Sequence, residues 1–374
     1  MVISTPFPPE EGIGYYTYNL SKKLVERGHQ VVVITRGSWS RTERESIDEI
    51  EVIKAPFIPV YPLYIHVHGM LVYKVFKKLE SEVDVVHFHT PLPPSIKTSL
   101  PVVTTIHTPM LSDNRYIEVS SLYSLLSKIS ARIVSYPVEL KLIQSSDIVT
   151  TVSKSVAQEL KEYHLNPEKV IVVGNGVDEK FFYPKQKILG DGKKYIMFAG
   201  RIDREKGLFD LVESARYVCS EKPDVFFIIA GKGRDLGKLR ESIRKAKLQD
   251  RFIFPGQVNK DQLVKLYQDA TIFVFPSYHE GLPGAVLEAM SCGLPVIATD
   301  VRGNRDLISN GETGILVPPR SPEKMAETIS MLLKDKNFRK NLGRNARKTV
   351  EEKYTWDVVS NKFLRCYESL VGDR

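Results

Sequence analysis

Two basic side chains stand in a short glycine-flanked stretch of the second half of the sequence. Arg201 and Lys206 follow the apolar run 195–199 and lie between Gly200 and Gly207. Two cations at the carboxyl end of a strand can hold a diphosphate and neutralise its charge as it leaves. The alternative is a solvated basic loop. The position directly after a strand, together with the flanking glycines, favours the functional interpretation.

A second stretch, residues 277–288, combines two carboxylates with a glycine-rich turn. Glu280 lies on the predicted loop after the strand 272–275, and Glu288 lies in the following helix. A step of eight residues turns about 80° beyond two full helical turns, so both side chains can face one side. Such carboxylates suit sugar and ribose hydroxyls, and backbone amides at the helix start suit phosphates. The contacts predicted for a phosphorylated ligand therefore also include Gly281, Leu282 and Pro283. A surface helix with ordinary acids is the alternative, which the apolar residues around Glu288 disfavour.

The first half of the sequence offers glycines and histidines instead. Gly12 and Gly14 stand where a strand runs through a loop into a helix, an arrangement that permits close approach of an anion. A plain turn into a helix explains them equally well. His107 ends the strand 102–106, while His87 and His89 end another. We predict a functional role for His107 and favour a structural role for the other two, and we do not expect the three to bind a metal.

No Asp-X-Asp pair occurs in the sequence. Such a pair commonly holds the metal that binds a diphosphate during sugar transfer. Its absence favours charge neutralisation by Arg201, Lys206 and helix dipoles, and we predict neither a metal nor a cofactor.

Strands and helices alternate along the chain, which predicts parallel sheets covered on both faces. Strands of a first unit are predicted at the apolar runs 31–34, 83–87, 102–106, 147–151 and 171–173. The first strand, near residue 2, has few residues: either this strand is unusually short, or its true start lies upstream. A polar stretch rich in Pro and Gly follows. Strands of a second unit are predicted at 195–199, 225–230, 252–254, 272–275, 295–298 and 314–317, with helices beginning near residues 208, 235, 260, 282 and 322. Ligands of such sheets bind at the carboxyl ends of the strands.

Length and composition narrow the class of protein. The chain has 374 residues, a length that suggests two domains. Its net charge of +8 suits a phosphate-bearing substrate or an anionic membrane surface. No basic arm, helix-turn-helix pattern or aromatic RNA-binding motif occurs, so we expect no nucleic-acid partner. No signal peptide and no apolar run of about 20 residues is found, which predicts a cytoplasmic protein. The cysteines, Cys219, Cys292 and Cys366, are too scattered for a disulfide framework or a zinc site.

These motifs together resemble those of retaining glycosyltransferase family 4, the glycosyl transferases group 1. The resemblance rests on Gly200-Arg201 with Lys206-Gly207, Phe275-Pro276-Ser277, Glu280-Gly281 through Glu288-Ala289, Gly293-Leu294-Pro295-Val296 and Asn175-Gly176-Val177-Asp178. It implies an α/β protein of the GT-B class, in which two Rossmann-like doubly wound parallel-sheet domains enclose a cleft. The corresponding boundaries are 1–180 for an acceptor-binding domain, 181–194 for a linker, 195–355 for a nucleotide-sugar-binding domain and 356–374 for a helix that crosses back.

The resemblance also implies an activity: metal-independent transfer of a hexosyl group, with retention, from a UDP- or GDP-linked sugar to a glycan or lipid-linked acceptor. Arg201 and Lys206 would hold the diphosphate, Glu280 the donor sugar and Glu288 the ribose. His107 would lie near the reacting centre, and Gly12 and Gly14 would face the phosphates or the acceptor. The family's mechanism is front-face attack, in which the leaving phosphate helps to deprotonate the acceptor and Glu280 is no nucleophile.

One segment departs from the family pattern. Where many relatives have a Gly-Gly-Xaa-Pro-Glu-like loop, this chain has Arg302 and Arg305 within 301–308. An acidic donor or a phosphorylated acceptor is one explanation, and a surface variation without catalytic meaning is the other. Residues 61–78 and 121–141 mix apolar, aromatic and basic side chains, a composition found in helices that lie on anionic membranes. We favour burial of one face in the core for most of these residues, and retain peripheral contact with the inner face of the membrane as the alternative.

Two rival functions remain within the same fold. A nucleotide-sugar 2-epimerase would bind the same kind of ligand, and would consume donor without any acceptor. A non-catalytic nucleotide-sugar-binding subunit would bind it without reaction, although the charged positions are intact. A third rival, a nicotinamide oxidoreductase, is disfavoured because Gly12 and Gly14 are followed by Thr17 where a full GxGxxG motif has a third glycine.

Overall fold

The structure, a computed structural model, describes residues 1–3, 5, 7, 12–60, 64–90, 96–116, 122–185 and 192–372. The chain divides into two compact units: unit 1 comprises Met1–Asn175 and Trp356–Arg374, and unit 2 comprises Gly176–Thr355. Each is an α/β unit built on a largely parallel sheet, so the predicted fold class is confirmed. The division falls five residues earlier than the boundary drawn from the sequence, because 176–180 belong to unit 2.

The sheet of unit 1 consists of two parts joined by one residue. One part has the order β1 (Val32–Arg36), β3 (Ile50–Ala55), β2 (Glu43–Ile47), and the other runs β4 (Val86–His89), β5 (Val102–Ile106), β6 (Ile148–Thr151), β7 (Val170–Val172). Val2 forms parallel bridges to both Ile34 and Phe88 and so connects the two parts. The short first strand predicted from the sequence is thus, among the described residues, this single bridging position.

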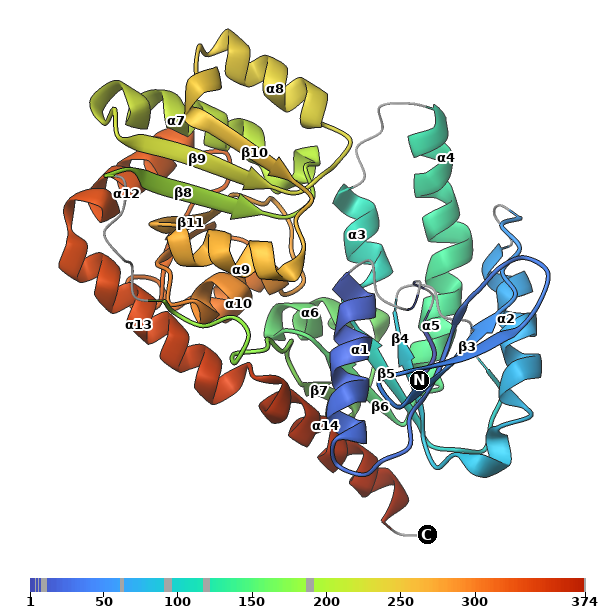
Figure 1. The fold of residues 1–374 in the computed structure, drawn as a ribbon. Helices are drawn as coiled ribbons and strands as arrows, with labels where there is room; N and C mark the ends of the chain where they lie inside the picture. Colours follow the sequence, from blue (N-terminus) through green and yellow to red (C-terminus); the bar gives the residue numbers. More distant parts are fainter. Residues whose placement is uncertain are drawn as a thin grey trace. The chain divides into compact units, whose positions relative to one another are not determined.

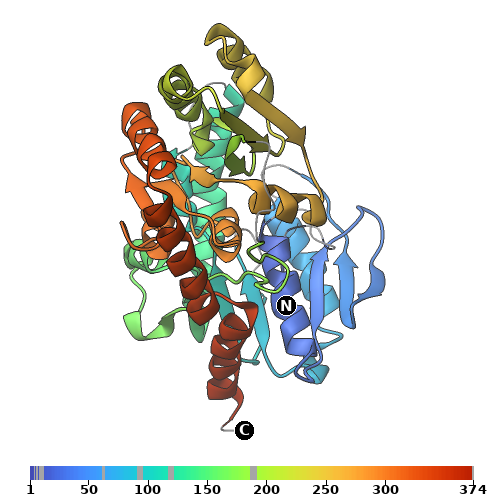
Figure 2. The ribbon, with the colours of Figure 1, turned by 60° about the vertical axis from the view of Figure 1, so that its left-hand side comes forward.

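The antiparallel hairpin β2–β3 at the edge of this sheet was not predicted (Figure 1, Figure 2). Its two turn residues, Asp48 and Glu49, have positive φ angles of 48° and 63°. A two-residue turn of this kind usually contains glycine or asparagine, so its sequence gives little signal.

Helices cover both faces of this sheet. On one face, α1 (Gly12–Val25) packs against the C-terminal α14 (Trp356–Val371), which also contacts Val103 and Ile148 of the sheet. On the other face lie α2 (Tyr64–Phe76) and α5 (Tyr136–Gln144), whose apolar side chains share a core cluster with β3 and β4. The remaining segments are η1 (Glu80–Glu82), α3 (Met110–Tyr116), α4 (Leu122–Ser130), the π-helical η2 (Ala131–Ser135), α6 (Lys154–Glu159), η3 (Leu160–Tyr163) and η4 (Pro167–Lys169).

Unit 2 has a fully parallel six-stranded sheet. Its order is β10 (Phe252–Gly256), β9 (Val225–Ala230), β8 (Lys194–Ala199), β11 (Ile272–Phe275), β12 (Val296–Thr299), β13 (Ile315–Val317). Both β11 and β12 are buried along their whole length, as their uninterrupted apolar sequences predict for strands covered on both faces. The linker predicted at 181–194 belongs to this unit, and residues 186–191 lie outside the described part.

The helices of unit 2 also form two layers (Figure 1). One layer contains α7 (Leu208–Glu221), α8 (Leu236–Lys245) and α12 (Pro322–Lys334), and the other contains α9 (Lys260–Asp269), α10 (Gly284–Ser291) and α13 (Lys336–Lys353). Two short elements, η5 (Arg204–Lys206) and η6 (Gln249–Arg251), precede α7 and β10. The segment 302–307, for which we predicted no helix, forms α11 (Arg302–Leu307).

The strand order of unit 2 reverses between β8 and β11. From β8 the chain continues through α7 to β9, whereas from the neighbouring β11 it continues through α10 to β12 on the other side. The loops that leave these two strands therefore diverge to opposite faces. This topological switch point is where open α/β sheets bind ligands.

Candidate functional site

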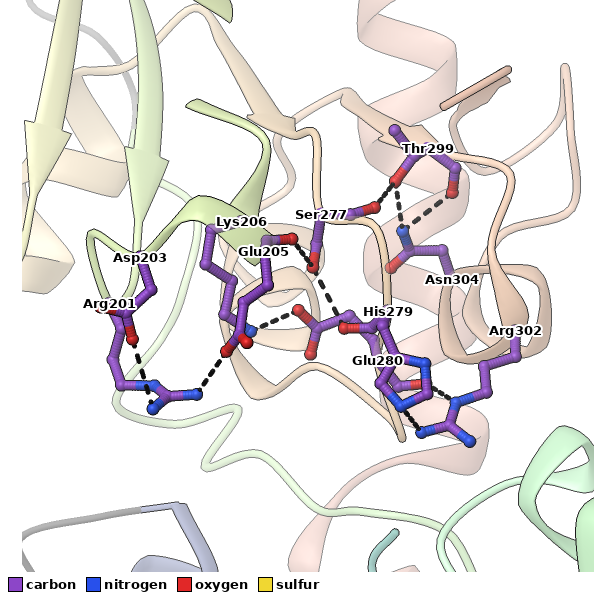
Figure 3. A network of polar contacts seen from close by, with 10 residues as sticks. All are labelled: Arg201, Asp203, Glu205, Lys206, Ser277, His279, Glu280, Thr299, Arg302 and Asn304. Carbon is purple, nitrogen blue, oxygen red and sulfur yellow. Dashed lines mark hydrogen bonds and ion pairs between the residues drawn. The ribbon is translucent and has the colours of Figure 1, made fainter. Parts of the chain in front are cut away.

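An ion pair occupies the switch point of unit 2. Nζ of Lys206 lies 2.5 Å from Oε1 of Glu280, although the two residues are 74 positions apart (Figure 3). The two side chains are only 13% and 12% exposed. Nζ of Lys206 also lies 5.8 Å from the centre of the Phe275 ring. Lys206 ends η5 after β8, and Glu280 lies on the loop after β11, so the fold brings together the two charged stretches selected from the sequence.

Arg201 has different partners. Its guanidinium lies 2.8 Å from Oε1 of Glu205 and 3.4 Å from Oδ2 of Asp203, and its side chain is 68% exposed. Asp203 itself is buried, and it accepts a hydrogen bond of 3.1 Å from the backbone N–H of Arg234. Because the Arg201 side chain is exposed, its ion pair with the half-exposed Glu205 is weak, and exchanging this partner for an incoming anion costs little.

The loop that carries Glu280 is held from three sides (Figure 3). The hydroxyl of Ser277 donates to the backbone oxygen of His279, at 3.1 Å, and Thr299 donates to the backbone oxygen of Ser277. Nε of Arg302 donates to the backbone oxygen of Glu280 at 2.8 Å, and the same guanidinium contacts Nε2 of His279. Arg302 therefore braces this loop from α11, whereas Arg305 pairs with Asp300 on the surface.

Glycines allow the loops of this sheet edge to touch backbone to backbone. Gly207 has φ 66°, and a Cβ there would collide with the backbone oxygen of Pro276. Gly231, after β9, has φ 143°, and a Cβ there would collide with the backbone oxygen of Gly200. Side chains at either position would separate neighbouring loops, which explains the glycine that flanks the stretch with Arg201 and Lys206. A Cβ on Gly303 of α11 would likewise collide with the backbone oxygen of Gly281.

Glu288 belongs to a different environment from Glu280. Its Oε2 accepts a hydrogen bond of 2.8 Å from the hydroxyl of Tyr267 on α9. Burial raises the pKa of Glu288 to about 7, although the bond from Tyr267 acts in the opposite direction. Gly281, Leu282 and Pro283 are buried between the two carboxylates, and Pro283 caps the start of α10. The two acids thus flank one helix start but have separate partners.

In unit 1, the three histidines lie together. His107 follows β5, and its Nε2 lies 3.4 Å from Nδ1 of His89. The rings of His107 and Tyr16 meet edge to face, with centres 4.8 Å apart. Burial lowers the pKa of His107 to about 3, so its ring is neutral at ordinary pH. His107 is therefore suited to hydrogen bonding and not to charge stabilisation.

His87 is held by hydroxyls on both ring nitrogens. Nδ1 lies 2.7 Å from the hydroxyl of Tyr367 on α14, and Nε2 lies 2.6 Å from Oγ1 of Thr105. Gly14 is buried in α1, whereas Gly12 is exposed at its start and a Cβ there would meet nothing within 4 Å. The structure gives no steric reason for a glycine at position 12.

Comparison with known proteins covers both units. The sequence model of the glycosyl transferases group 1 matches residues 179–349, and that of glycosyltransferase family 4 matches residues 11–181. The chain belongs to the group 1, family 4 glycosyltransferases. An uncharacterized glycosyltransferase of Methanocaldococcus jannaschii is 29% identical to it over 98% of this chain and 97% of its own.

Solved structures show the same fold for this glycosyltransferase. Sucrose-phosphate synthase from Thermosynechococcus elongatus matches with a TM-score of 0.83 and 22% identity, covering 100% of this chain and 99% of the other. Anabaena HepE, solved in complex with UDP-glucose, matches with a TM-score of 0.74 and 17% identity, covering 99% of each chain. The glycosyltransferase is thus a GT-B protein, as the resemblance implied.

The sequence predicted the charged residues of the glycosyltransferase's site. It did not predict the residues that hold the loops on which these charges stand. Asp203, Ser277 and Thr299 received no role, although each lies at or just after the carboxyl end of a predicted strand. Their position was the available signal. Arg302 was read as added charge at the site, whereas its guanidinium is engaged by His279 and Glu280.

Proposed function

We propose that this glycosyltransferase transfers a hexosyl group from a UDP- or GDP-linked sugar to a glycan or lipid-linked acceptor, with retention and without a metal. The observation that carries the proposal is the enclosed pair of Lys206 and Glu280 at the switch point. A cation and a carboxylate that are held together in a shielded site can separate to serve a diphosphate and a sugar hydroxyl.

Each group then has one task. Lys206, joined by Arg201, neutralises the diphosphate as the bond between the anomeric carbon and the phosphate oxygen breaks. Glu280 accepts hydrogen bonds from the sugar hydroxyls, and Glu288 accepts one from the ribose. The acceptor oxygen bonds to the same face of the anomeric carbon, and its proton passes to the leaving phosphate. His107, which is neutral, contributes a hydrogen bond to the donor sugar.

Two observations support a nucleotide-sugar donor. The site lies at the carboxyl edge of a doubly wound sheet, next to backbone amides at the start of α10, where phosphates bind. HepE, which shares the fold, was solved with UDP-glucose. A uridine nucleotide is therefore the first donor to test.

A panel of UDP-, GDP- and ADP-sugars, each with and without EDTA, tests the proposal by thermal shift and by turnover. We expect one nucleotide class to raise the Tm and support transfer at the same rate with chelator. Lys206→Ala should lose transfer while keeping the wild-type circular dichroism, and Lys245→Ala on the surface of α8 is its control. Turnover that stops with EDTA, or a fully active Lys206→Ala, would refute the proposal. Donor consumption without acceptor would instead indicate an epimerase.

A further inference from the structure

One face of unit 1 has a hollow that is lined by residues of α2, α5 and the segment 96–102. Parallel neighbours normally need a crossover that contains a helix. Here only residues 90–101 separate the two strands, and the described ones, 90 and 96–101, include no helix. The helices α2 and α5 lie on this face, and their side chains line the hollow together with Lys97. We call this hollow the α2–α5 groove.

The α2–α5 groove contains two adjoining pockets of about 620 and 610 Å³ that share three lining residues, Tyr73, Lys97 and Lys141. The first pocket is lined mainly by apolar side chains, among them Ile65, Met70 and Val138. The second continues toward Val102 at the start of β5 and Ser145 after α5. The groove thus combines a mainly apolar first pocket with a second pocket whose lining is mixed polar and apolar.

Its charged rim is almost entirely basic. The titratable side chains of the first pocket among the described residues are His66, Tyr73, Lys97 and Lys141. Neither lysine has an ion pair with a described residue. The second pocket adds Lys77 and Glu80, which pair with each other and so cancel. Lys97 and Lys141 therefore leave two uncompensated positive charges beside the mainly apolar first pocket.

Large apolar side chains stand exposed next to this groove. Met70 is 61% exposed and Ile133 is 67% exposed, and both line the first pocket. Leu125, Leu126 and Ile129 of α4, just before η2, are exposed as well. Residues 64–78 and 122–138 contain no Asp or Glu. Exposed apolar side chains that line a groove, as Met70 and Ile133 do, mark an interaction site, and the basic residues around them favour an anionic partner. None of the described helices is long and apolar enough to cross a bilayer.

We propose that the α2–α5 groove binds a lipid phosphate, with its hydrocarbon chain in the first pocket and its phosphate on Lys97 and Lys141. The identification of the α2–α5 groove as the acceptor site rests on the proposed function. A connection to the reacting side exists within unit 1, because α3, which begins three residues after His107, packs against η2 and α5. The structure thus narrows the glycan or lipid-linked acceptor to a phosphate-bearing lipid.

Binding of alkyl phosphates to the full chain, measured by calorimetry below the critical micelle concentration, tests the site. Dodecyl phosphate should bind, octyl phosphate should bind at least about tenfold more weakly, and inorganic phosphate at the same concentration should not bind, because each buried methylene contributes up to about fourfold. Dodecyl maltoside, which has the chain without the charge, should bind more weakly than dodecyl phosphate.

The double variant Lys97→Gln/Lys141→Gln should lose at least about tenfold in affinity for dodecyl phosphate. Its matched control is Lys74→Gln/Lys78→Gln, which removes the same charge from α2 and from the turn that follows it, outside both pockets, and should stay within twofold of wild type. Met70→Glu/Ile133→Glu should weaken binding of the dodecyl hydrocarbon chain. Ile253→Glu, at an exposed position of β10, is the control.

If the Lys97→Gln/Lys141→Gln variant and its control bind dodecyl phosphate with equal affinity, the proposed lipid-phosphate site is refuted. Flotation with phosphatidylglycerol vesicles gives a second readout. If both double lysine variants lose vesicle binding equally, the protein is attracted to the membrane surface by its general charge, and the proposed site is refuted. Failure here is separate from failure of the proposed function. If alkyl phosphates bind as expected but no nucleotide sugar raises the Tm, the proposed lipid-phosphate site is supported and the proposed sugar transfer is refuted.

Discussion

The carboxyl edges of the two sheets differ in the charge of the side chains that they carry. In unit 2 the edge carries a full ion pair, Lys206 with Glu280, held by loops that touch through glycine backbones. In unit 1 it carries neutral imidazoles, which are held by side chains, including Tyr367 of the C-terminal helix. A diphosphate needs mobile positive charge, and a sugar hydroxyl needs only a fixed neutral partner. On the proposed function, this contrast assigns the leaving group to unit 2 and the positioning of neutral groups to unit 1.

The largest effect should come from the charged edge. Glu280→Ala removes the sugar contact and leaves Lys206 without its partner in a shielded site, so kcat/KM should fall by about 10²–10³. Initial rates at several donor concentrations measure this. Glu241→Ala, on the surface of α8, is the control and should be neutral. If His107→Gln lowers kcat/KM as much as Glu280→Ala does, the division of labour between the edges is wrong.

The glycine contacts of unit 2 should be the next most sensitive feature. Gly231→Ala places a Cβ against Gly200 at a positive φ, and should lower the free energy of unfolding by about 2–4 kcal/mol. Gly237→Ala, in α8 with nothing within 4 Å of its Cβ, should instead raise it by about 0.5–1 kcal/mol. Urea titrations of both variants measure the difference. Equal changes in the two variants would show that the close contact between Gly231 and the backbone of Gly200 does not contribute to the free energy of unfolding.

The neutral edge should respond more weakly. Tyr367→Phe leaves Nδ1 of buried His87 without its hydroxyl partner, and should lower the free energy of unfolding by about 1–2 kcal/mol. Tyr217→Phe, at an exposed position of α7, should change it by less than about 0.5 kcal/mol. A loss as large as that of Gly231→Ala would mean that side chains lock unit 1 as firmly as backbone contacts lock unit 2.

The smallest effect is a shift in pH dependence. Because the pKa of Glu288 is raised to about 7, its protonated form favours the folded state, so this stabilisation is complete below about pH 4.5 and is lost as the pH rises to 7. Relative to Glu288→Gln, the wild type should lose stability over that range. Donor affinity should rise through pH 7 as the carboxylate forms. Tyr267→Phe should move this midpoint upward, by less than about one unit, because the lost hydrogen bond favoured the carboxylate.

The pKa of His107, lowered to about 3 by burial, predicts that this imidazole contributes no step near pH 6.5 to the same binding curve. Titrating donor affinity in His107→Gln checks this. A midpoint that moves in this variant would show that the imidazole changes its charge during binding.

The sequence predicts the parallel strands well, because their apolar runs are uninterrupted and the loops that follow carry glycine and charge. It also predicts Lys206 and Glu280, since both stand just after strands. It does not predict that these two side chains touch, because their proximity depends on β8 and β11 being neighbours across 74 positions. The β2–β3 hairpin was missed, since Asp48 and Glu49 adopt positive φ without glycine. The bracing role of Arg302 was missed because a short helix replaces a predicted loop.

The interlocking glycines have an evolutionary consequence. Adjoining loops of unit 2 meet through main-chain atoms at Gly207 and Gly231, and side chains such as Ser277, Thr299 and Arg302 hold the Glu280 loop. The other side chains of these loops are not needed to keep the loops together. Substitutions at such positions can retune which sugar or nucleotide is preferred while the scaffold persists. One architecture can in this way diversify into many specificities, provided that the few residues lacking a side chain are kept.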